Sequence, residues 1–296
     1  MPRTMPTIPP KKAPGAPPAL PPSKPTRQAK RFTSAAWTGS GQGEKIVVYG
    51  GSGVGKTSLL AMMPGAVFLG LDDGGRKIRD GRTGEPITVV EGVQTFADVR
   101  DAIHQTDLWP KGSSCVIDTG TLLENWAEPW MFDNIKHEKG GTVTSIEGYG
   151  YGKGFVHLFD TMRLILQDLD ALIRRGVNVG IACQSMAIRR ANPGGTDYLY
   201  DGPKLSHPTS EKFSTRLHVC EWADHVVKID FIGTGVQAGK TDRVGKAVAA
   251  GEVQRAVFTM PEPHFFAKTR SLLHPVIAFA QADDDSLWRL LFEEIA

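Results

Sequence analysis

Residues 45–60 read Lys-Ile-Val-Val-Tyr-Gly-Gly-Ser-Gly-Val-Gly-Lys-Thr-Ser-Leu-Leu, and this stretch decides the fold. A short apolar run, Ile46 to Tyr49, is typical of a buried strand, and residues that favour a helix begin after Thr57. Between them, residues 50–57 fit Gly-x-x-x-x-Gly-Lys-Thr, the pattern of a phosphate-binding loop in the strand-to-helix context that it requires. The stretch therefore predicts an α/β protein that binds a nucleotide.

The residue types of this loop (the P-loop below) match what a triphosphate and its metal need. Glycines adopt positive φ, so successive backbone N–H groups can turn toward phosphate oxygens. The helix that follows points its positive end at the same anion. Lys56 is expected to reach the β- and γ-phosphates and Thr57 to hold Mg²⁺, so we predict ATP and Mg²⁺ as cofactors. The predicted cradle consists of Gly50, Gly51, Ser52, Gly53, Val54, Gly55, Lys56, Thr57 and Ser58.

Two further apolar runs end in carboxylates. Residues 66–71 are followed by Asp72 and Asp73, and residues 115–117 are followed by Asp118. Ligands of open α/β sheets bind at the carboxyl ends of the strands. We therefore expect Asp118 to hold Mg²⁺ through water, beside the P-loop threonine. Asp72 or Asp73 is a candidate to polarise the attacking water, and an ordinary turn rich in Asp and Gly is the alternative.

The remaining apolar patterns alternate between strand and helix. They predict strands over 87–90, 177–183, 224–232 and 253–260, and helices over 96–103, 155–173, 210–222 and 287–295. This alternation predicts a mainly parallel central sheet flanked by helices. Gln184 follows the strand over 177–183, where its amide either senses the γ-phosphate or serves as a cap.

Two long stretches, 138–154 and 186–209, carry aromatic and basic residues without a regular pattern. Such a mixture suits single-stranded nucleic acid, because rings stack on bases while cations follow phosphates. Solvated connecting loops are the alternative. The candidate DNA-binding residues are Tyr149, Tyr151, Lys153, Arg189, Arg190 and Lys204. Further on, Lys268 and Arg270 are two apart on an extended segment and point the same way, toward solvent or a phosphate.

Length, composition and charge indicate which classes of protein the chain can belong to. With 296 residues, 41% of them hydrophobic, the chain can build one large α/β core. The net charge of +2 gives no global attraction for nucleic acid, so a basic surface must be local. Cys115, Cys183 and Cys220 lie far apart, which favours buried thiols in a reducing compartment. No apolar run approaches the about 18 residues of a membrane span, and we expect a cytoplasmic protein without membrane contact.

The chain divides into three parts. Residues 1–36 are Pro-rich and basic, which predicts a disordered tail that aids solubility or tethers nucleic acid or a partner weakly. Residues 37–275 contain the nucleotide motifs and form the predicted ATPase domain. Residues 276–296 end in an acidic, amphipathic helix that packs on the core or docks on a neighbour.

The order of these motifs resembles that of phage-encoded P-loop ATPases with a RecA-like core, namely the short Sak-type recombination proteins and their close relatives of the AAA type. The resemblance covers roughly residues 43–275. It rests on Gly50–Thr57, Asp72, Cys115–Asp118, Gly148–Gly154, Gln184, Glu221–Asp224 and Ala267–Arg270. The resemblance implies a Mg²⁺-dependent, DNA-stimulated ATPase that binds single-stranded DNA in phage recombination or strand annealing.

The resemblance also assigns roles to residues. Asp72 matches the glutamate that activates water in RecA-like proteins, one methylene shorter. Gln184 matches the glutamine that couples the γ-phosphate to a DNA-binding loop, and the stretches 138–154 and 186–209 match the loops along the DNA path.

By the same resemblance, Lys268 and Arg270 match the pair that RecA-like helicases and recombinases insert into a neighbouring subunit's nucleotide site. The implied partners are single-stranded DNA, further copies of the chain in a ring or filament, and a single-strand binding protein. Two alternatives stay open. One is a ring-shaped motor of the helicase or packaging type, and the other is a nucleotide-gated binding module with little turnover.

Overall fold

The computed structural model describes residues 33–34, 36, 41–192, 194–237 and 246–293, and all structural statements below concern these residues. The described residues from 41 onward belong to one compact unit. The predicted disordered tail over 1–36 lies outside the described residues except for 33–34 and 36.

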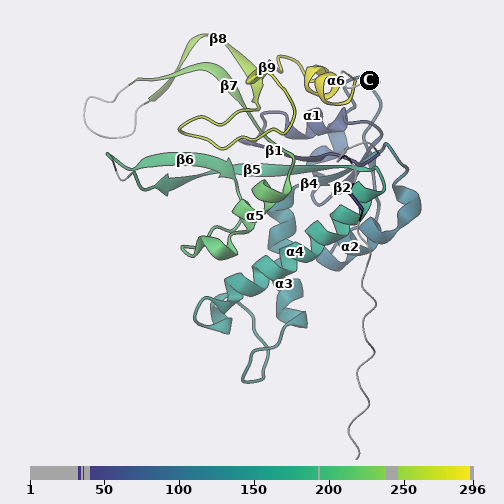
Figure 1. Cartoon of the computed structure of the whole chain (residues 1–296), viewed down its shortest axis with the longest axis vertical. Helices are drawn as coiled ribbons and strands as arrows, with labels where there is room; N and C mark the ends of the chain where they lie inside the picture. The colour runs from purple at the N-terminus through teal and green to yellow at the C-terminus, as the bar shows by residue number, and fades with distance from the viewer. Residues whose placement is uncertain (1–32, 35, 37–40, 193, 238–245, 294–296) are drawn as a thin grey trace, which may run out of the picture. The chain divides into compact units, whose positions relative to one another are not determined.

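A nine-stranded sheet forms the centre of the described unit (Figure 1). Its order is β3 (Thr88–Val89), β2 (Ala66–Gly70), β4 (Ser114–Asp118), β5 (Asn178–Arg190), β1 (Lys45–Gly50), β7 (His225–Gln237), β8 (Lys246–Phe258) and β9 (Val276–Ala278), with β6 (Tyr198–Pro203) pairing with β5. Every pairing from β3 to β7 is parallel, whereas the pairs β7–β8, β8–β9 and β5–β6 are antiparallel. The predicted mainly parallel α/β sheet is confirmed.

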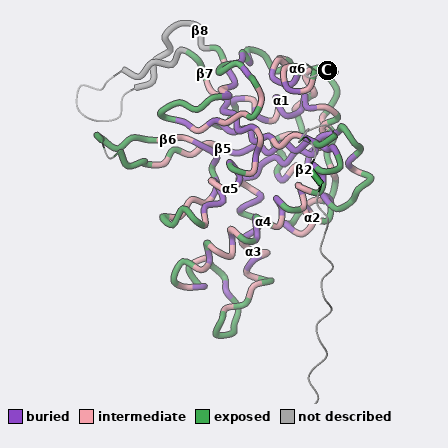
Figure 2. The backbone as a smooth tube through the Cα atoms, viewed as in Figure 1, coloured by how far each residue is buried: buried purple, intermediate pink, exposed green. Residues whose placement is uncertain are grey.

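Helices cover both faces of the sheet (Figures 1 and 2). The helices on one face are α2 (Phe96–His104), α3 (Gly120–Asn134), α4 (Lys153–Arg174) and α5 (Thr215–Trp222), and those on the other are α1 (Lys56–Ala61) and α6 (Ser286–Phe292). Short 3-10 helices span Asp73–Lys77, Thr106–Leu108, Glu147–Tyr149 and Glu211–Phe213. No helix in the described ranges is both long enough and apolar enough to cross a membrane.

The sequence of β1 shows why the central strands lie inside. Ile46 and Val48 pack in the core on the α1 and α6 side, while Val47 and Tyr49 pack in the core on the α2–α5 side. A parallel strand that is covered on both faces needs apolar residues at every position, which is why it appears as a continuous apolar run. Cys115, Cys183 and Cys220 are free and buried in the same layers, as predicted.

The prediction of an irregular stretch over 186–209 is wrong for 186–190 and 198–203, which form strands, whereas residues 204–209 contain neither helix nor strand. Strand β5 does not stop near Cys183 but continues to Arg190, turns, and returns as β6, with Ile188 opposite Tyr200. We call this antiparallel extension, residues 185–203, the hairpin. Figure 2 shows that burial decreases along β5 toward the hairpin end. Because a ribbon outside the core has no face that must be apolar, it carries none of the alternation that reveals a strand.

Helix α6 closes the second face of the sheet. The indole of Trp288 is fully buried, and its Nε1 donates a hydrogen bond to the Leu59 carbonyl of α1 at 2.7 Å. Leu287 and Leu291 are buried beside it. The predicted amphipathic helix therefore packs on the core of its own chain and supports α1, the helix that begins within the P-loop motif.

Replacing Trp288 tests this support. Trp288→Ala should lower the free energy of unfolding by about 3–5 kcal/mol, because it empties a fully buried site. Trp288→Phe keeps most of the ring, loses the hydrogen bond, and should cost about 1 kcal/mol. Urea unfolding measures both. Equal losses in the two variants would show that packing of the ring does not hold α6 in place.

Candidate nucleotide-binding site

The P-loop adopts the backbone that its glycines predict. Gly53 and Gly55 have φ of +76° and +105°, a region that strains residues with a side chain. Gly50 meets a different requirement, because a Cβ there would lie 2.5 Å from the Ile229 carbonyl oxygen of β7. The glycines are thus needed both for the turn and for the close approach of β1 to its neighbour.

Lys56, Thr57 and Asp118 come together at the carboxyl edge of the sheet. The Thr57 hydroxyl donates to Asp118 Oδ2 at 2.7 Å, and the Lys56 ammonium donates to the carbonyls of Gly51 at 2.7 Å and Gly50 at 3.1 Å. Asp118 ends β4, which is separated from β1 by β5. The parallel register brings the ends of these strands to one edge, as expected for ligand sites in open α/β sheets.

Lys56 and Asp118 carry charges that are buried in this site, and the neighbouring groups offset the effect of burial only in part. Burial raises the pKa of Asp118, and nearby Asp72 raises it further, against the hydrogen bond from Thr57 and the charge of Lys56. Burial also lowers the pKa of Lys56, against the charge of Asp118. A divalent cation and phosphate oxygens carry the opposite charges. Thr57 and Asp118 therefore fit a site that would hold Mg²⁺, and Lys56 fits one that would hold phosphates.

A cleft of about 370 Å³ opens over the P-loop. Asp72, Asp118 and Gln184 all line it, so the structure brings together polar residues that follow β2, end β4 and lie within β5. Gln184 is therefore not at the end of its strand, as the sequence predicted, but in its middle. Asp72 Oδ1 accepts a hydrogen bond from Gly74 N–H at 2.7 Å, which fixes the carboxylate at the start of a 3-10 helix. Asp73 does not line this cleft, and its side chain is 89% exposed. Of the two carboxylates, only Asp72 lines the cleft over the P-loop.

Arg255 of β8 also lines the cleft, although no sequence pattern singles it out. Its guanidinium donates to the carbonyls of Val54 at 3.3 Å and Ala280 at 3.0 Å and lies 4.9 Å from the Phe279 ring centre. It therefore braces the P-loop against the β9 side of the sheet. A residue about two hundred positions from the loop leaves no local motif by which to find it.

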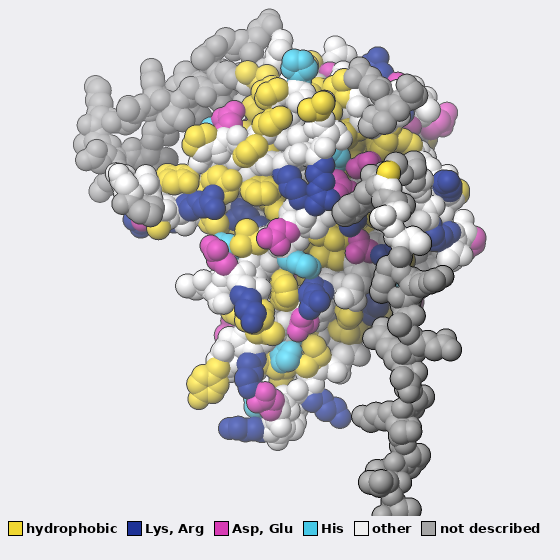
Figure 3. All heavy atoms as spheres, in the orientation of Figure 1, with side chains coloured by type: hydrophobic (Ala, Val, Ile, Leu, Met, Phe, Trp, Pro, Cys, Tyr) yellow, Lys and Arg dark blue, Asp and Glu magenta, His cyan; other side chains and the backbone are white. Residues whose placement is uncertain are grey.

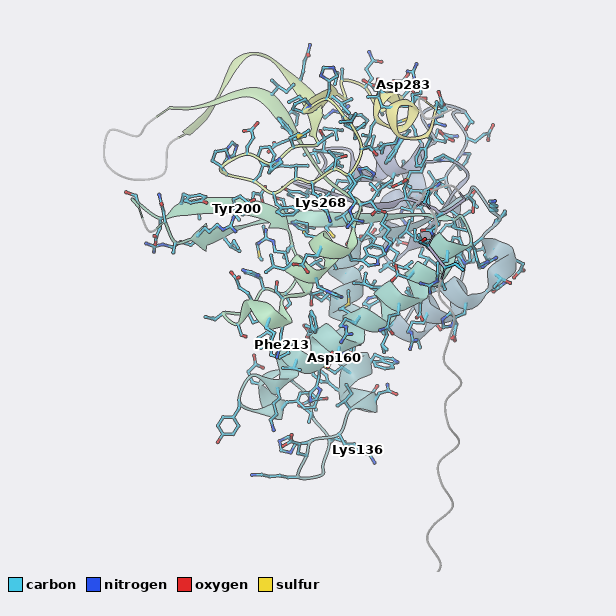
Figure 4. The ribbon with its side chains drawn as sticks, viewed as in Figure 1. Lys136, Asp160, Tyr200, Phe213, Lys268 and Asp283 are labelled. Atoms are coloured by element: carbon cyan, nitrogen blue, oxygen red, sulfur yellow. The ribbon has the colours of Figure 1, made fainter. Side chains whose placement is uncertain are left out.

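Lys268 and Arg270 lie toward the other end of the parallel strands. Lys268 forms a bridge with Val226, near the start of β7, and its ammonium donates to three carbonyls at the end of α5 at 2.6–3.1 Å (Figure 4). Arg270 pairs with Asp224 at 2.6 Å, with a side chain that is 59% exposed. Neither residue lines the nucleotide cleft of its own chain.

The candidate DNA-binding residues of the first stretch do not form a surface together. Tyr149 is a core residue, because it is 4% exposed and its hydroxyl donates to two carbonyls of the α3 end. Its ring is therefore not available to stack on a base, which corrects the sequence-based assignment. Tyr151 is fully exposed at φ +48°, and Lys153 pairs with Glu138 at 2.6 Å.

The hairpin does bring aromatic and basic side chains together. Its register places Arg190, Tyr198 and Tyr200 on one face, and we call these residues the hairpin face. The Arg190 guanidinium lies 4.5 Å from the Tyr200 ring centre, and the two tyrosine rings meet edge to face at 6.4 Å. Arg189 points to the opposite face and pairs with Asp197 at 2.9 Å. In Figure 3, basic and hydrophobic side chains alternate along the surface over β5 and β6.

Gln184 connects the cleft with the hairpin. It lies opposite Gly50 in the β1–β5 register, and its N–H donates to Thr121 Oγ1 at 3.1 Å. The same hydroxyl donates to the carbonyl of Lys204 at 3.0 Å, and Lys204 N–H returns a hydrogen bond to the Gln184 carbonyl at 2.7 Å. Thr121 stands three residues after Asp118. Thr121 therefore links the end of β4 at Asp118 to the backbone of Gln184 and to Lys204, the residue that follows β6.

Comparison with known proteins supports a nucleotide site. The family model of an AAA domain matches residues 42–271. No curated protein matches the chain. Among solved structures, the KaiC-like protein PH0186 from Pyrococcus horikoshii OT3 is similar, with 15% identity, coverage of 80% of this chain and 90% of that chain, and a TM-score of 0.38.

The buried charge of Asp118 lowers the stability of the folded protein, and this effect can be measured. Because its pKa is raised in the folded state, the ionised carboxylate weakens folding once the pH exceeds the range in which unfolded Asp titrates. At neutral pH, Asp118→Asn should therefore raise the melting temperature of the nucleotide-free protein. It should also remove the further rise that Mg²⁺ and ATP produce in the unaltered protein.

The matched control is Asp160→Asn, which changes an exposed carboxylate of α4 that pairs with Arg163. It should leave both melting temperatures nearly unchanged, since exposed ion pairs contribute little. A lower melting temperature of nucleotide-free Asp118→Asn would contradict the electrostatic account of the site.

Proposed function

This chain belongs to the AAA domain family and is a P-loop ATPase, and we propose that it uses ATP to act on single-stranded DNA in recombination or strand annealing. One observation carries the proposal. Strand β5 holds Gln184 in the nucleotide cleft at one point and Arg190 on the hairpin face six residues later. A single run of backbone thus joins the site of ATP chemistry to a surface with the composition of a DNA-binding face.

The hairpin face has the chemistry that single strands require. Tyr198 is 38% exposed, so its ring is accessible to an unstacked base. Arg190 lies against Tyr200 and offers a cation beside the ring. Stacking on aromatic rings and contact of cations with the backbone together bind single strands with little sequence preference. This composition supports DNA as the ligand of the hairpin.

In the cleft, different side chains have different roles in ATP hydrolysis. Lys56 and the loop N–H groups would hold the phosphates. Thr57, and Asp118 through water, would hold Mg²⁺, which would supply positive charge. Asp72 is the base that orients and deprotonates water, and Gln184 senses the γ-phosphate. The hydrogen bond that Gly74 N–H donates to Asp72 Oδ1 keeps the carboxylate at the cleft wall.

The proposal includes a homo-oligomer, a ring or a filament. Lys268 and Arg270 contact α5 and Asp224 in their own chain, away from their own cleft. Arg270 is exposed, which leaves its guanidinium accessible to a second copy. We assign Arg270 to the nucleotide site of a neighbouring subunit, where a cation stabilises the charge that develops on the phosphates. The three N–H donors of Lys268 are used within its own chain, so Lys268 supports the segment that carries Arg270.

Steady-state ATP hydrolysis with and without single-stranded DNA tests the proposal. DNA should stimulate the unaltered protein, and Lys56→Ala should abolish both rates. Arg270→Ala should abolish turnover while ATP binding persists. Tyr200→Ala should keep the basal rate and weaken DNA binding by roughly 5- to 150-fold, the equivalent of about 1–3 kcal/mol for one stacked base.

The control is Phe231→Ala, which removes an exposed aromatic ring from β7 and should change neither rate. Hydrolysis that is indifferent to DNA would overturn the DNA part of the proposal and leave a nucleotide-gated binding module. Full turnover in Arg270→Ala would overturn the role in the neighbouring subunit.

Thr121 offers a separate test of coupling. Thr121→Val is close in shape but loses both hydrogen bonds of the hydroxyl, whereas Thr121→Ser keeps the hydroxyl. We expect the valine variant to bind ATP normally and to lose most of the stimulation by DNA, and the serine variant to retain it. Equal stimulation in the two variants would show that Thr121 does not couple the sites.

A further inference from the structure

A second cavity, of about 300 Å³, lies at the base of the hairpin. We call it the hairpin-base cavity. Its walls include Arg190 and Tyr200 from the hairpin, His207 from the segment after β6, and Arg216 from α5. Cationic and aromatic groups therefore enclose one volume beside the hairpin face, although they come from three different segments of the chain.

Arg216 is the unusual member of this cavity. The residue is 4% exposed, and its Nη2 donates to the Met186 carbonyl of β5 at 2.6 Å. Within the described part of the chain, its Nη1 has no hydrogen-bond partner, and no carboxylate forms an ion pair with the guanidinium. A buried cation with a spare donor is costly unless an acceptor completes it.

The shape of β6 is adapted to this guanidinium. Gly202 lies above it, and a Cβ at that position would be 2.6 Å from Arg216 Nη2. The glycine therefore lets the planar group lie under the strand, next to the carbonyl of Met186. Burial lowers the pKa of Arg216, but the guanidinium stays charged because its ordinary pKa is so high.

The surrounding charges leave the cavity positive. His207 lines the same cavity as Arg216 and Arg190. Burial lowers the pKa of His207, and the charges of these two arginines lower it further, against the charge of Glu211. Glu211 is the acidic residue of the cavity wall, and it is exposed. His207 Nδ1 lies 2.8 Å from the hydroxyl of Ser214, which precedes α5. Three arginines, Arg189, Arg190 and Arg216, line the cavity against this one solvated carboxylate. Asp201, which is not part of the wall, adds one further negative charge near Arg216.

We propose that the hairpin-base cavity binds a phosphodiester group of single-stranded DNA, with Arg216 and Arg190 as its cations and Tyr200 beneath the adjoining base. The inference rests on the proposed function and names the site through which the strand is held. A guanidinium is suited to a phosphate because its planar set of donors matches the phosphate oxygens. The phosphate gives the spare donor of Arg216 an acceptor, which removes the cost of its burial.

The position of Arg216 also ties this contact to the nucleotide cleft. Met186, whose carbonyl accepts from Arg216, stands two residues after Gln184 on β5. A phosphate that binds Arg216 therefore affects the hydrogen bond between Arg216 and β5. Strand β5 is also the strand that places Gln184 in the nucleotide cleft. The residues that sequence patterns indicate, Arg189 and Arg190, do not include this anchor, because Arg216 enters from α5.

Salt dependence of DNA binding provides the test. The affinity for a fluorescein-labelled oligo-dT is measured by anisotropy over a series of KCl concentrations, with full-length protein. Each phosphate contact contributes about 0.7 to the slope of log affinity against log salt for single strands. Arg216→Gln should lower the affinity and reduce that slope by about 0.7. Arg163→Gln, which changes an exposed arginine of α4, should leave the slope unchanged.

A second variant keeps the test decisive if Arg216→Gln does not fold. Leu217→Glu introduces a carboxylate on α5 at the cavity wall, where it competes with the phosphate for Arg216. It should weaken DNA binding and reduce the slope without lowering the melting temperature. Wild-type affinity and slope in the folded variants would overturn the inference alone. No binding of oligo-dT by the unaltered protein would overturn the proposed function as well.

Discussion

The geometry of the nucleotide site depends on the pairing of β5 with both β1 and β4. Parallel hydrogen bonds on the two sides fix Gln184 opposite Gly50 and Ala182 opposite Asp118. The P-loop and the acidic strand end are therefore held one strand apart, and the inserted strand places a polar amide between them. Since parallel pairing allows no slip without moving every apolar side chain to the other face, this register is strongly specified.

Three of the buried charges among the described residues lie in the functional regions. Lys56 and Asp118 face the cleft, and Arg216 faces the hairpin-base cavity. Folding alone disfavours such groups, because each loses its hydration and gains incomplete partners. Ligands of opposite charge, a metal ion and phosphates, would restore those partners. Buried charge that a ligand can complete is thus common to the nucleotide site and to the site proposed at the base of the hairpin.

Sequence patterns predicted the parts of the protein that local chemistry determines. The P-loop, the strand ending at Asp118 and helix α2 all follow from residues close together in the chain. Helix α3 was not predicted, and its residues lack a strong one-sided apolar pattern. Tyr149 looked like a loop aromatic because its burial comes from contacts with α3 and α4, which no local pattern records.

Long-range contacts explain the remaining differences. The hairpin was missed because its strands are exposed ribbons beyond the core, where apolar alternation is not required. Arg255 and Arg216 reach their sites from β8 and α5, far along the chain from the P-loop and from β5. Their roles depend on which strands pair, so they become visible only when the sheet order is known.

The central claim is that β5 transmits the state of the nucleotide to the hairpin. Amide hydrogen exchange with and without Mg²⁺ and a non-hydrolysable ATP analogue tests it most directly. The account predicts slower exchange upon nucleotide binding at Gln184 and Lys204, whose N–H groups belong to the Thr121 network, and across residues 186–203 of the hairpin. Protection confined to the P-loop and α1, with no change in the hairpin, would contradict it.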